Sequence, residues 1–283
     1  MLKRQYDCFI GCDKEYEEAK TVLFGAPFDS TTSYRPGARF APKVIRAESF
    51  GIETYSPYQD RDITDIAVMD SGDIELPFGN TERVLGMIEE RVRRILTDGK
   101  KPVMMGGEHL VTLGAVKAAA KIFPDLHILH FDAHCDLREY YLGEKLSHAT
   151  VMRSIWDILG DGRIYQLGIR SGDKEEFVFA HKHTVMYKYN LNRLDEVIEK
   201  LKDKPVYFSL DLDVLDTAMF PGTGTPEPGG IGFLELLEGV IKLKGLNIIG
   251  CDMNELCPSY DMSGASTAVA CKTLRELLLS VTD

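Results

Sequence analysis

The chain alternates short apolar runs with segments of helical periodicity, and this alternation constrains its fold more than any other feature. The apolar runs that predict strands are residues 21–24, 66–69, 102–105, 126–131, 164–168, 206–210 and 246–250. Between them the sequence predicts a helix from the cap Asn80 to the stop Gly99, and helices at 110–123, 148–159, 191–203, 232–243 and 264–280. Such alternation is typical of a mostly parallel sheet with helices on both faces. We therefore expect an α/β fold, built as one three-layer α/β/α domain over residues 1–283.

Composition excludes several classes of function. The 283 residues include 33 basic and 44 acidic side chains, a formal charge of −11, whereas a nucleic-acid-binding surface needs a basic footprint. An acidic chain suits a cationic substrate or metal ions instead. No apolar run is long enough to cross a bilayer and no secretory signal is visible, so we expect no membrane partner. The six cysteines are scattered, and Cys8 and Cys12 lack the second pair of a zinc site, which favours a reducing, cytoplasmic location.

Polar residues gather directly after four of the predicted strands. The sequence GGEH follows the 102–105 strand at 106–109, and DAHCD follows the 126–131 strand at 132–136. DLD follows the 206–210 strand at 211–213, and DMNE lies just beyond the last strand at 252–255. In open α/β sheets the ligand crevice lies outside the carboxyl ends of the strands. We therefore expect these residues to share one crevice.

Several carboxylates would meet there. Side chains alternate in direction along an extended chain, so Asp132, His134 and Asp136 can point the same way, as can Asp211 and Asp213. Two carboxylates ~4 Å apart repel by about 4 kcal/mol at an effective dielectric near 20, which favours bound cations. Two divalent ions would balance the four Asp charges. The predicted metal ligands are His109, Asp132, His134, Asp136, Asp211 and Asp213.

This set of Asp oxygens and His nitrogens suits Mn²⁺ and could also take Zn²⁺, Co²⁺, Ni²⁺ or Fe²⁺. The lack of thiolates argues against a structural zinc site, and Cys135 should face away from the ligands and pack. Each fragment alone has a simpler explanation, because D-x-D and D-x-H sequences often form solvated turns and a single His before a helix is often a cap. The four fragments together favour a metal centre.

These motifs together resemble the ureohydrolases, the family of arginase, agmatinase and their relatives. The similarity rests on GGEH at 106–109, DAHCD at 132–136, SLDLDVLD at 209–216 and PGTGTPEPGG at 221–230, with YRPGARF at 34–40 resembling the family's N-terminal segment. The resemblance runs from about residue 20 to the C-terminus. It implies a three-layer α/β/α domain with a parallel eight-stranded sheet, and an assembly of three or six copies, a homotrimer or a homohexamer.

The resemblance also implies a role for each matching residue. His109 and Asp136 would bind one Mn²⁺ and His134 and Asp213 a second, while Asp132 and Asp211 would bridge or touch both. Two further residues match family positions that do not bind metal. His148 matches the proton-shuttling histidine, and Glu255 matches the glutamate that receives the substrate guanidinium. Two Mn²⁺ ions per subunit are therefore expected, and other divalent metals are possible.

The mechanism that follows is a hypothesis at this point. Water activated by the two ions would attack the guanidinium carbon held by Glu255, Asp136 would relay a proton, and His148 would exchange it with solvent because a histidine pKa lies near working pH. Each catalytic assignment has a structural alternative. His148 could be a solvent-facing helix cap, and Glu255 a salt-bridged loop acid.

The substrate is less constrained than the reaction. The loop at 137–146 resembles that of microbial agmatinases, so we expect hydrolysis of agmatine to putrescine and urea. Glu139 and Glu144 could attract the distal ammonium of agmatine, whereas Arg138 could pair with a substrate carboxylate and favour guanidinobutyrate. Another amidinohydrolase, such as an arginase or formimidoylglutamase, is a further alternative. From other classes, a metal-binding protein without activity and a single-zinc deacetylase also remain open.

Overall fold

An eight-stranded sheet forms the middle of the molecule. The computed structural model describes residues 7–282, so residues 1–6 and 283 of the predicted domain lie outside the described residues. The strand order is β4-β1-β5-β10-β9-β6-β7-β8, and every neighbouring pair is parallel. The strands are β1 Thr21–Ala26, β4 Val68–Asp73, β5 Lys101–Gly106, β6 His127–Phe131, β7 Ile164–Ile169, β8 Val185–Lys188, β9 Pro205–Asp211 and β10 Asn247–Asn254. A separate antiparallel ribbon pairs β2 Tyr55–Ser56 with β3 Arg61–Asp62.

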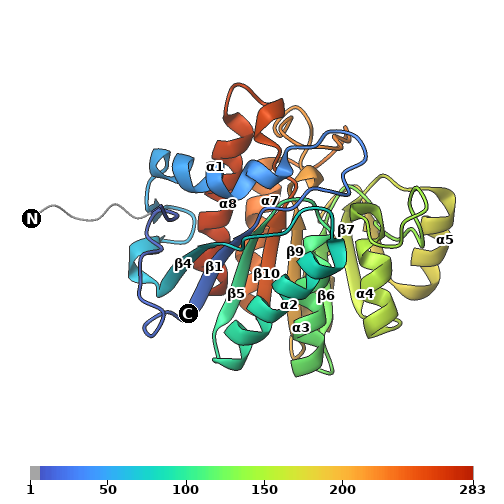
Figure 1. The fold of residues 1–283 in the computed structure, drawn as a ribbon, viewed down its shortest axis with the longest axis horizontal. Coiled ribbons are helices and arrows are strands. Elements are labelled where there is room, and N and C mark those ends of the chain that lie inside the picture. Colours follow the sequence, from blue (N-terminus) through green and yellow to red (C-terminus); the bar gives the residue numbers. More distant parts are fainter. Residues whose placement is uncertain (1–6, 283) are drawn as a thin grey trace, which may run out of the picture.

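Helices cover both faces of this sheet (Figure 1). The helices are α1 Ala41–Glu48, α2 Thr81–Thr97, α3 Val111–Ile122, α4 Val151–Leu159, α5 Lys174–His183, α6 Leu194–Leu201, α7 Phe233–Lys242 and α8 Ala265–Val281. Buried side chains of α1, α6, α7 and α8 share one core with the sheet, and those of α2, α3, α4 and α5 share the other. Successive residues of a strand enter opposite cores, as Val103 and Met104 of β5 do. The predicted three-layer α/β/α fold is confirmed.

Among the strands of the main sheet and the α-helices, three were absent from the sequence prediction. Strand β8 is a short, half-buried edge strand, so it lacks the continuous apolar run of the inner strands. Helix α5 has the charged sequence KEEFVFAHKH and buries only Glu176 and Ala180, so no apolar stripe marks it. Its start is instead defined by a capping box between Asp173 and Glu176. Helix α1 was also missed, and β10 extends four residues beyond the predicted 246–250, so that Asp252 and Asn254 lie within the strand.

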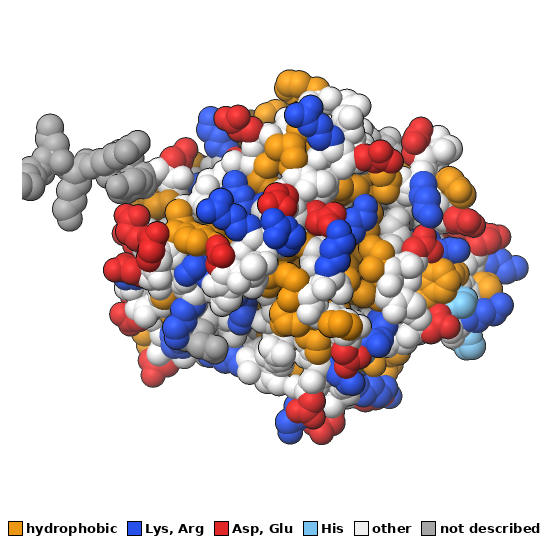
Figure 2. All heavy atoms as spheres, turned by 60° about the horizontal axis from the view of Figure 1, so that its bottom comes forward, with side chains coloured by type: hydrophobic (Ala, Val, Ile, Leu, Met, Phe, Trp, Pro, Cys, Tyr) orange, Lys and Arg blue, Asp and Glu red, His pale blue; other side chains and the backbone are white. Residues whose placement is uncertain are grey.

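On the face drawn in Figure 2, Lys and Arg side chains are interspersed with acidic and apolar ones. Within residues 7–282, no helix is both long enough and apolar enough to cross a membrane.

A buried ion pair ties α1 to the edge of the sheet. The Arg46 guanidinium on α1 donates to both carboxylate oxygens of Asp70 on β4, from Nε at 2.7 Å and from Nη2 at 2.9 Å, and it also pairs with Asp73. The side chains of Arg46 and Asp70 are 4% and 0% exposed. Removing one partner of such a pair leaves an uncompensated buried charge.

We expect Arg46→Met to lower the free energy of unfolding by about 3–5 kcal/mol, because it leaves the Asp70 carboxylate buried without a cation. Arg93→Met is the matched control, since Arg93 pairs with Glu90 on the surface of α2, where an exposed ion pair contributes little to stability. Urea unfolding followed by circular dichroism measures both changes. Equal losses in the two variants would contradict the role given to the buried pair.

Candidate metal centre and active site

The four polar clusters predicted at strand ends do meet in one place. Their strands β5, β10, β9 and β6 are consecutive in the sheet, so their carboxyl ends lie side by side. A cavity of about 290 Å³ opens there. Its lining includes members of all four clusters, together with residues of the loops after β6 and β7.

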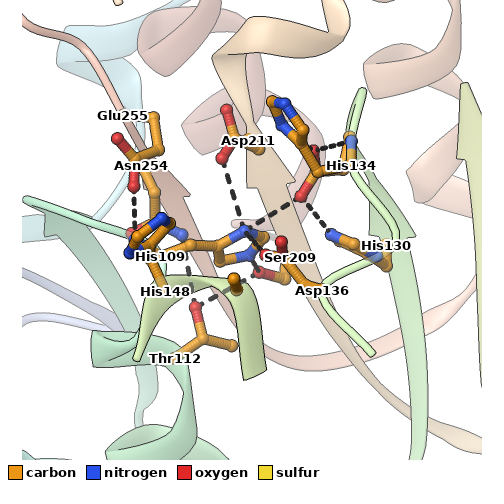
Figure 3. A network of polar contacts seen from close by, with 12 residues as sticks. His109, Thr112, His130, His134, Asp136, His148, Ser209, Asp211, Asn254 and Glu255 are labelled. Carbon is orange, nitrogen blue, oxygen red and sulfur yellow. Dashed lines mark hydrogen bonds and ion pairs between the residues drawn. The ribbon is translucent and has the colours of Figure 1, made fainter. Parts of the chain in front are cut away.

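One imidazole nitrogen lies at the centre of three carboxylates. The Nδ1 atom of His109 is 3.0 Å from Asp132 Oδ2, 3.2 Å from Asp136 Oδ2 and 3.3 Å from Asp211 Oδ2 (Figure 3). All four side chains are buried or nearly so. Burial by itself would lower the pKa of His109, but the three carboxylates outweigh burial and raise that pKa well above its usual range. The space between these four groups therefore attracts positive charge.

Hydrogen bonds on the other side of the ring decide which nitrogen carries the proton when His109 is neutral, as a metal ligand is. His109 Nε2 lies 2.8 Å from Ser209 Oγ, and the Ser209 hydroxyl donates its proton to Asp252 Oδ1 at 2.7 Å. Ser209 must then accept from His109, so the neutral ring is protonated at Nε2 and its Nδ1 lone pair faces the carboxylates. His109 Nδ1 is a buried atom without a hydrogen-bond partner among the described residues. A lone pair directed at three carboxylates is the arrangement that a metal ion completes.

A second cluster lies beside the first. His134 Nδ1 is 3.0 Å from Asp213 Oδ2 and 3.5 Å from Asp132 Oδ1, and Asp213 Oδ2 is also buried without a partner. Asp132 thus faces His109 with one oxygen and His134 with the other. Asp211 contacts the first cluster through Oδ2, while its Oδ1 accepts the backbone N–H of Asp213. The residues present fit two cations that share Asp132, which agrees with the donor chemistry expected from the sequence.

The backbone after β6 explains how Asp136 reaches the first cluster. The sequence argument assumed an extended chain from 132 to 136, but Asp136 has a φ of +54° in the left-handed region. Its carbonyl accepts the N–H groups of Met152 and Arg153 at the start of α4, which holds the turn in place. Asp136 therefore does reach His109 as predicted, but through a left-handed turn and not through the alternation of side chains along an extended chain.

His148 belongs to the same cavity and does not serve as the helix cap. The cap of the short 3₁₀ helix His148–Thr150 is Ser147, which forms a capping box with Thr150. His148 Nδ1 lies 2.9 Å from the Thr31 carbonyl, which can only accept, so Nε2 is the unprotonated nitrogen. Burial lowers the pKa of His148 to about 4. The ring is therefore neutral at neutral pH, and the expected pKa near working pH is wrong.

Glu255 is an unpaired acid at the end of β10. Its Oε1 accepts the backbone N–H of His109 at 2.7 Å, and its own N–H donates to the Gly107 carbonyl. The residue has a φ of +67°, a strained conformation that such contacts maintain. Burial and the neighbouring Glu108 raise the pKa of Glu255 well above its usual range, so a cation arriving in the cavity would be stabilised beside it.

Sequence reasoning assigned no role to the residues that support the site from below, although Ser209 and Asp252 belong to the quoted motifs. Gln166, His130, Ser209 and Asp252 pair in register across β7, β6, β9 and β10, and all four are fully buried. We call these four residues the polar row. Polar residues inside otherwise apolar strands were the signal that could have identified them, because buried polar groups need partners.

Glu108 was part of a quoted motif but had no assigned role. It accepts hydrogen bonds from the Thr31 N–H at 2.9 Å, from the Thr31 hydroxyl and from the Thr32 hydroxyl. The Thr31 hydroxyl oxygen in turn accepts the backbone N–H of His148. Glu108 therefore anchors the loop after β1 against His148.

Comparison with known proteins agrees with this arrangement. A sequence model of the Arginase family matches residues 19–280, and the chain belongs to that family. It is 50% identical over 275 residues to a curated agmatinase of Bacillus subtilis (strain 168), covering 96% of this chain and 95% of the relative. It is 33% identical to a guanidinobutyrase of Pseudomonas aeruginosa, covering 93% and 87%. The crystal structure of an agmatine ureohydrolase of Thermoplasma volcanium has a TM-score of 0.90 and 36% identity, covering 98% of this chain and 95% of that one.

The shared position of Asp132 leads to a prediction about metal stoichiometry. We expect the wild-type chain to bind two divalent ions, Asp213→Asn to keep one of them, and Asp132→Asn to keep neither tightly, because among the residues that the structure describes only Asp132 contacts both clusters. Elemental analysis after equilibrium dialysis against Mn²⁺ counts the ions. Equal stoichiometry in the two variants would contradict the bridging position of Asp132.

Proposed function

We propose that the protein hydrolyses the guanidino group of agmatine and releases putrescine and urea. The observation that carries this proposal is the pair of carboxylate–imidazole clusters sharing Asp132, in a cavity that Glu255 and His148 also line. The similarity to agmatinases over nearly the whole chain supports agmatine as the substrate.

The cations would be held by the predicted set of His109, Asp132, His134, Asp136, Asp211 and Asp213, and we propose two Mn²⁺ ions per subunit. When bound, such divalent cations would lower the pKa of a coordinated water molecule and so supply a nucleophile at neutral pH. We also propose that the chain forms a single domain. Six free cysteines support a reducing, cytoplasmic location, and the family resemblance supports a homotrimer or homohexamer.

The side chains of the cavity provide the remaining steps. Glu255 binds the substrate guanidinium through charge-assisted hydrogen bonds and so orients its carbon toward the nucleophile. Water adds to that carbon, and the bond to the alkylamine nitrogen breaks when this nitrogen gains a proton. Asp136 is placed to pass on the proton that water loses. His148 presents its unprotonated Nε2 beside the exposed Ser33, so it is placed to take up that proton transiently and, because its pKa is low, to pass it on to solvent.

The charges at the cavity wall support agmatine over guanidinobutyrate. Arg138 is already paired, with its Nη1 3.1 Å from Asp173 Oδ2 and its Nε 3.4 Å from Glu176 Oε2. Its guanidinium also lies over the Tyr141 ring, 4.9 Å from the ring centroid. Two acids against one base leave this part of the wall net negative, which suits the distal ammonium of agmatine and repels a distal carboxylate. Glu139 and Glu144, considered from the sequence, do not line this cavity.

A urea assay on the Mn²⁺-loaded protein tests this function. We expect kcat/KM to be at least about tenfold higher for agmatine than for guanidinobutyrate, since about 1.4 kcal/mol of charge discrimination gives that ratio. Arginine and formiminoglutamate serve as comparison substrates. A preference for guanidinobutyrate would contradict the reading of Arg138. A protein that holds two ions and releases urea from none of the four would be a metal-binding protein without this activity.

The role of His148 is tested by His148→Asn. We expect kcat to fall by roughly 10²-fold, because general acid–base catalysis contributes about that much, while the metal content stays at the wild-type value. Steady-state kinetics and elemental analysis on the same sample measure the two effects. A variant that loses its ions would instead assign His148 to metal binding.

A further inference from the structure

We infer that His130 is a positioning residue, whose single ring proton holds Asp132 in the orientation that both metal positions share. This inference rests on the metal centre proposed above. His130 is fully buried near the end of β6, between Gln166 on one side and Asp132 on the other. It is not part of the ligand set predicted from the sequence.

The amide of Gln166 determines which ring nitrogen carries the proton. Gln166 Nε2 lies 2.9 Å from the Cys135 carbonyl oxygen, which can only accept, so the atom there must be the amide nitrogen. Its second hydrogen points to His130 Nδ1 at 3.1 Å. His130 Nδ1 is therefore an acceptor, and the ring proton lies on Nε2.

That proton is donated to the shared carboxylate. His130 Nε2 lies 2.8 Å from Asp132 Oδ2, and the backbone N–H of His134 donates to Asp132 Oδ1 at 2.5 Å. Each oxygen of Asp132 thus receives one hydrogen bond from the protein and keeps lone pairs for the clusters of His109 and His134. With both oxygens held, the carboxylate cannot rotate out of the plane that serves the two clusters.

Two histidines therefore approach the same oxygen with opposite roles. Asp132 Oδ2 is 3.0 Å from His109 Nδ1 and 2.8 Å from His130 Nε2, and the two rings lie 5.0 Å apart between centroids (Figure 3). His109 presents a lone pair because Ser209 takes its proton, whereas His130 presents a proton because Gln166 occupies its lone pair. By distance alone His130 could be a third nitrogen ligand, but its protonated Nε2 excludes it.

Metal binding by His130 variants tests the inference without relying on activity. We expect His130→Leu to bind two Mn²⁺ ions per chain with about 10- to 100-fold weaker affinity, the range typical of losing a hydrogen bond to a metal ligand. His130→Gln keeps an N–H donor at the Nε2 position and should recover most of the affinity. His127→Leu is the matched control, because His127 lies on the same strand and bonds the Asp125 carbonyl far from the cavity. Competition titration with a chelator measures each affinity, and circular dichroism of the metal-free variants checks their folding.

Gln166→Met is a second variant that leaves His130 in place, in case His130→Leu does not fold. It frees His130 Nδ1 and so permits the other tautomer, and we expect weaker Mn²⁺ binding here as well. Wild-type affinity in His130→Leu or in Gln166→Met, beside a wild-type chain that binds two ions, would overturn this inference alone. Loss of one whole ion in His130→Leu would make His130 a ligand and also overturn it. A wild-type chain that binds fewer than two ions would overturn the metal centre itself.

Discussion

The repulsion between buried carboxylates is the constraint on which the rest of the site depends. Asp132, Asp136 and Asp211 converge on His109 at the ends of neighbouring parallel strands, where their burial leaves little water to screen them. Such a cluster is tolerable only with positive charge at its centre. The parallel sheet causes both the repulsion and the site that uses it. The topology that brings the acids into contact also leaves a cavity above them.

The surrounding structure controls where protons are allowed. Along the polar row, the proton of Ser209 goes to Asp252 and one amide hydrogen of Gln166 goes to His130, so each imidazole is held in one tautomer. Outside the polar row, the Thr31 carbonyl holds His148 in the tautomer protonated at Nδ1. In its neutral form His109 thus presents a ligand lone pair, whereas His130 presents a hydrogen-bond donor and His148 a proton acceptor. Residue type alone does not distinguish these roles, whereas the partner of the second ring nitrogen does.

Much of the fold and of the site could be predicted because both leave local signals. Strands buried on both faces appear as continuous apolar runs, and the residues that follow them were expected to share a crevice. Elements without such a signal were missed, as α5 and the edge strand β8 illustrate. Gln166 was also missed, because the role of a single polar residue in an apolar strand depends on hydrogen-bond partners that only the fold reveals.

The sequence by itself determined the kind of fold, the set of acids and histidines and the reaction class they suggest, because composition, periodicity and motif spacing are properties of the chain alone. Tertiary structure decided which groups touch. Strand register placed His130 beside Gln166 and Ser209 beside Asp252, and loop packing paired Arg138 with Asp173. Those contacts join residues tens of positions apart, and a shift of one residue in register would turn each side chain to the other face of the sheet.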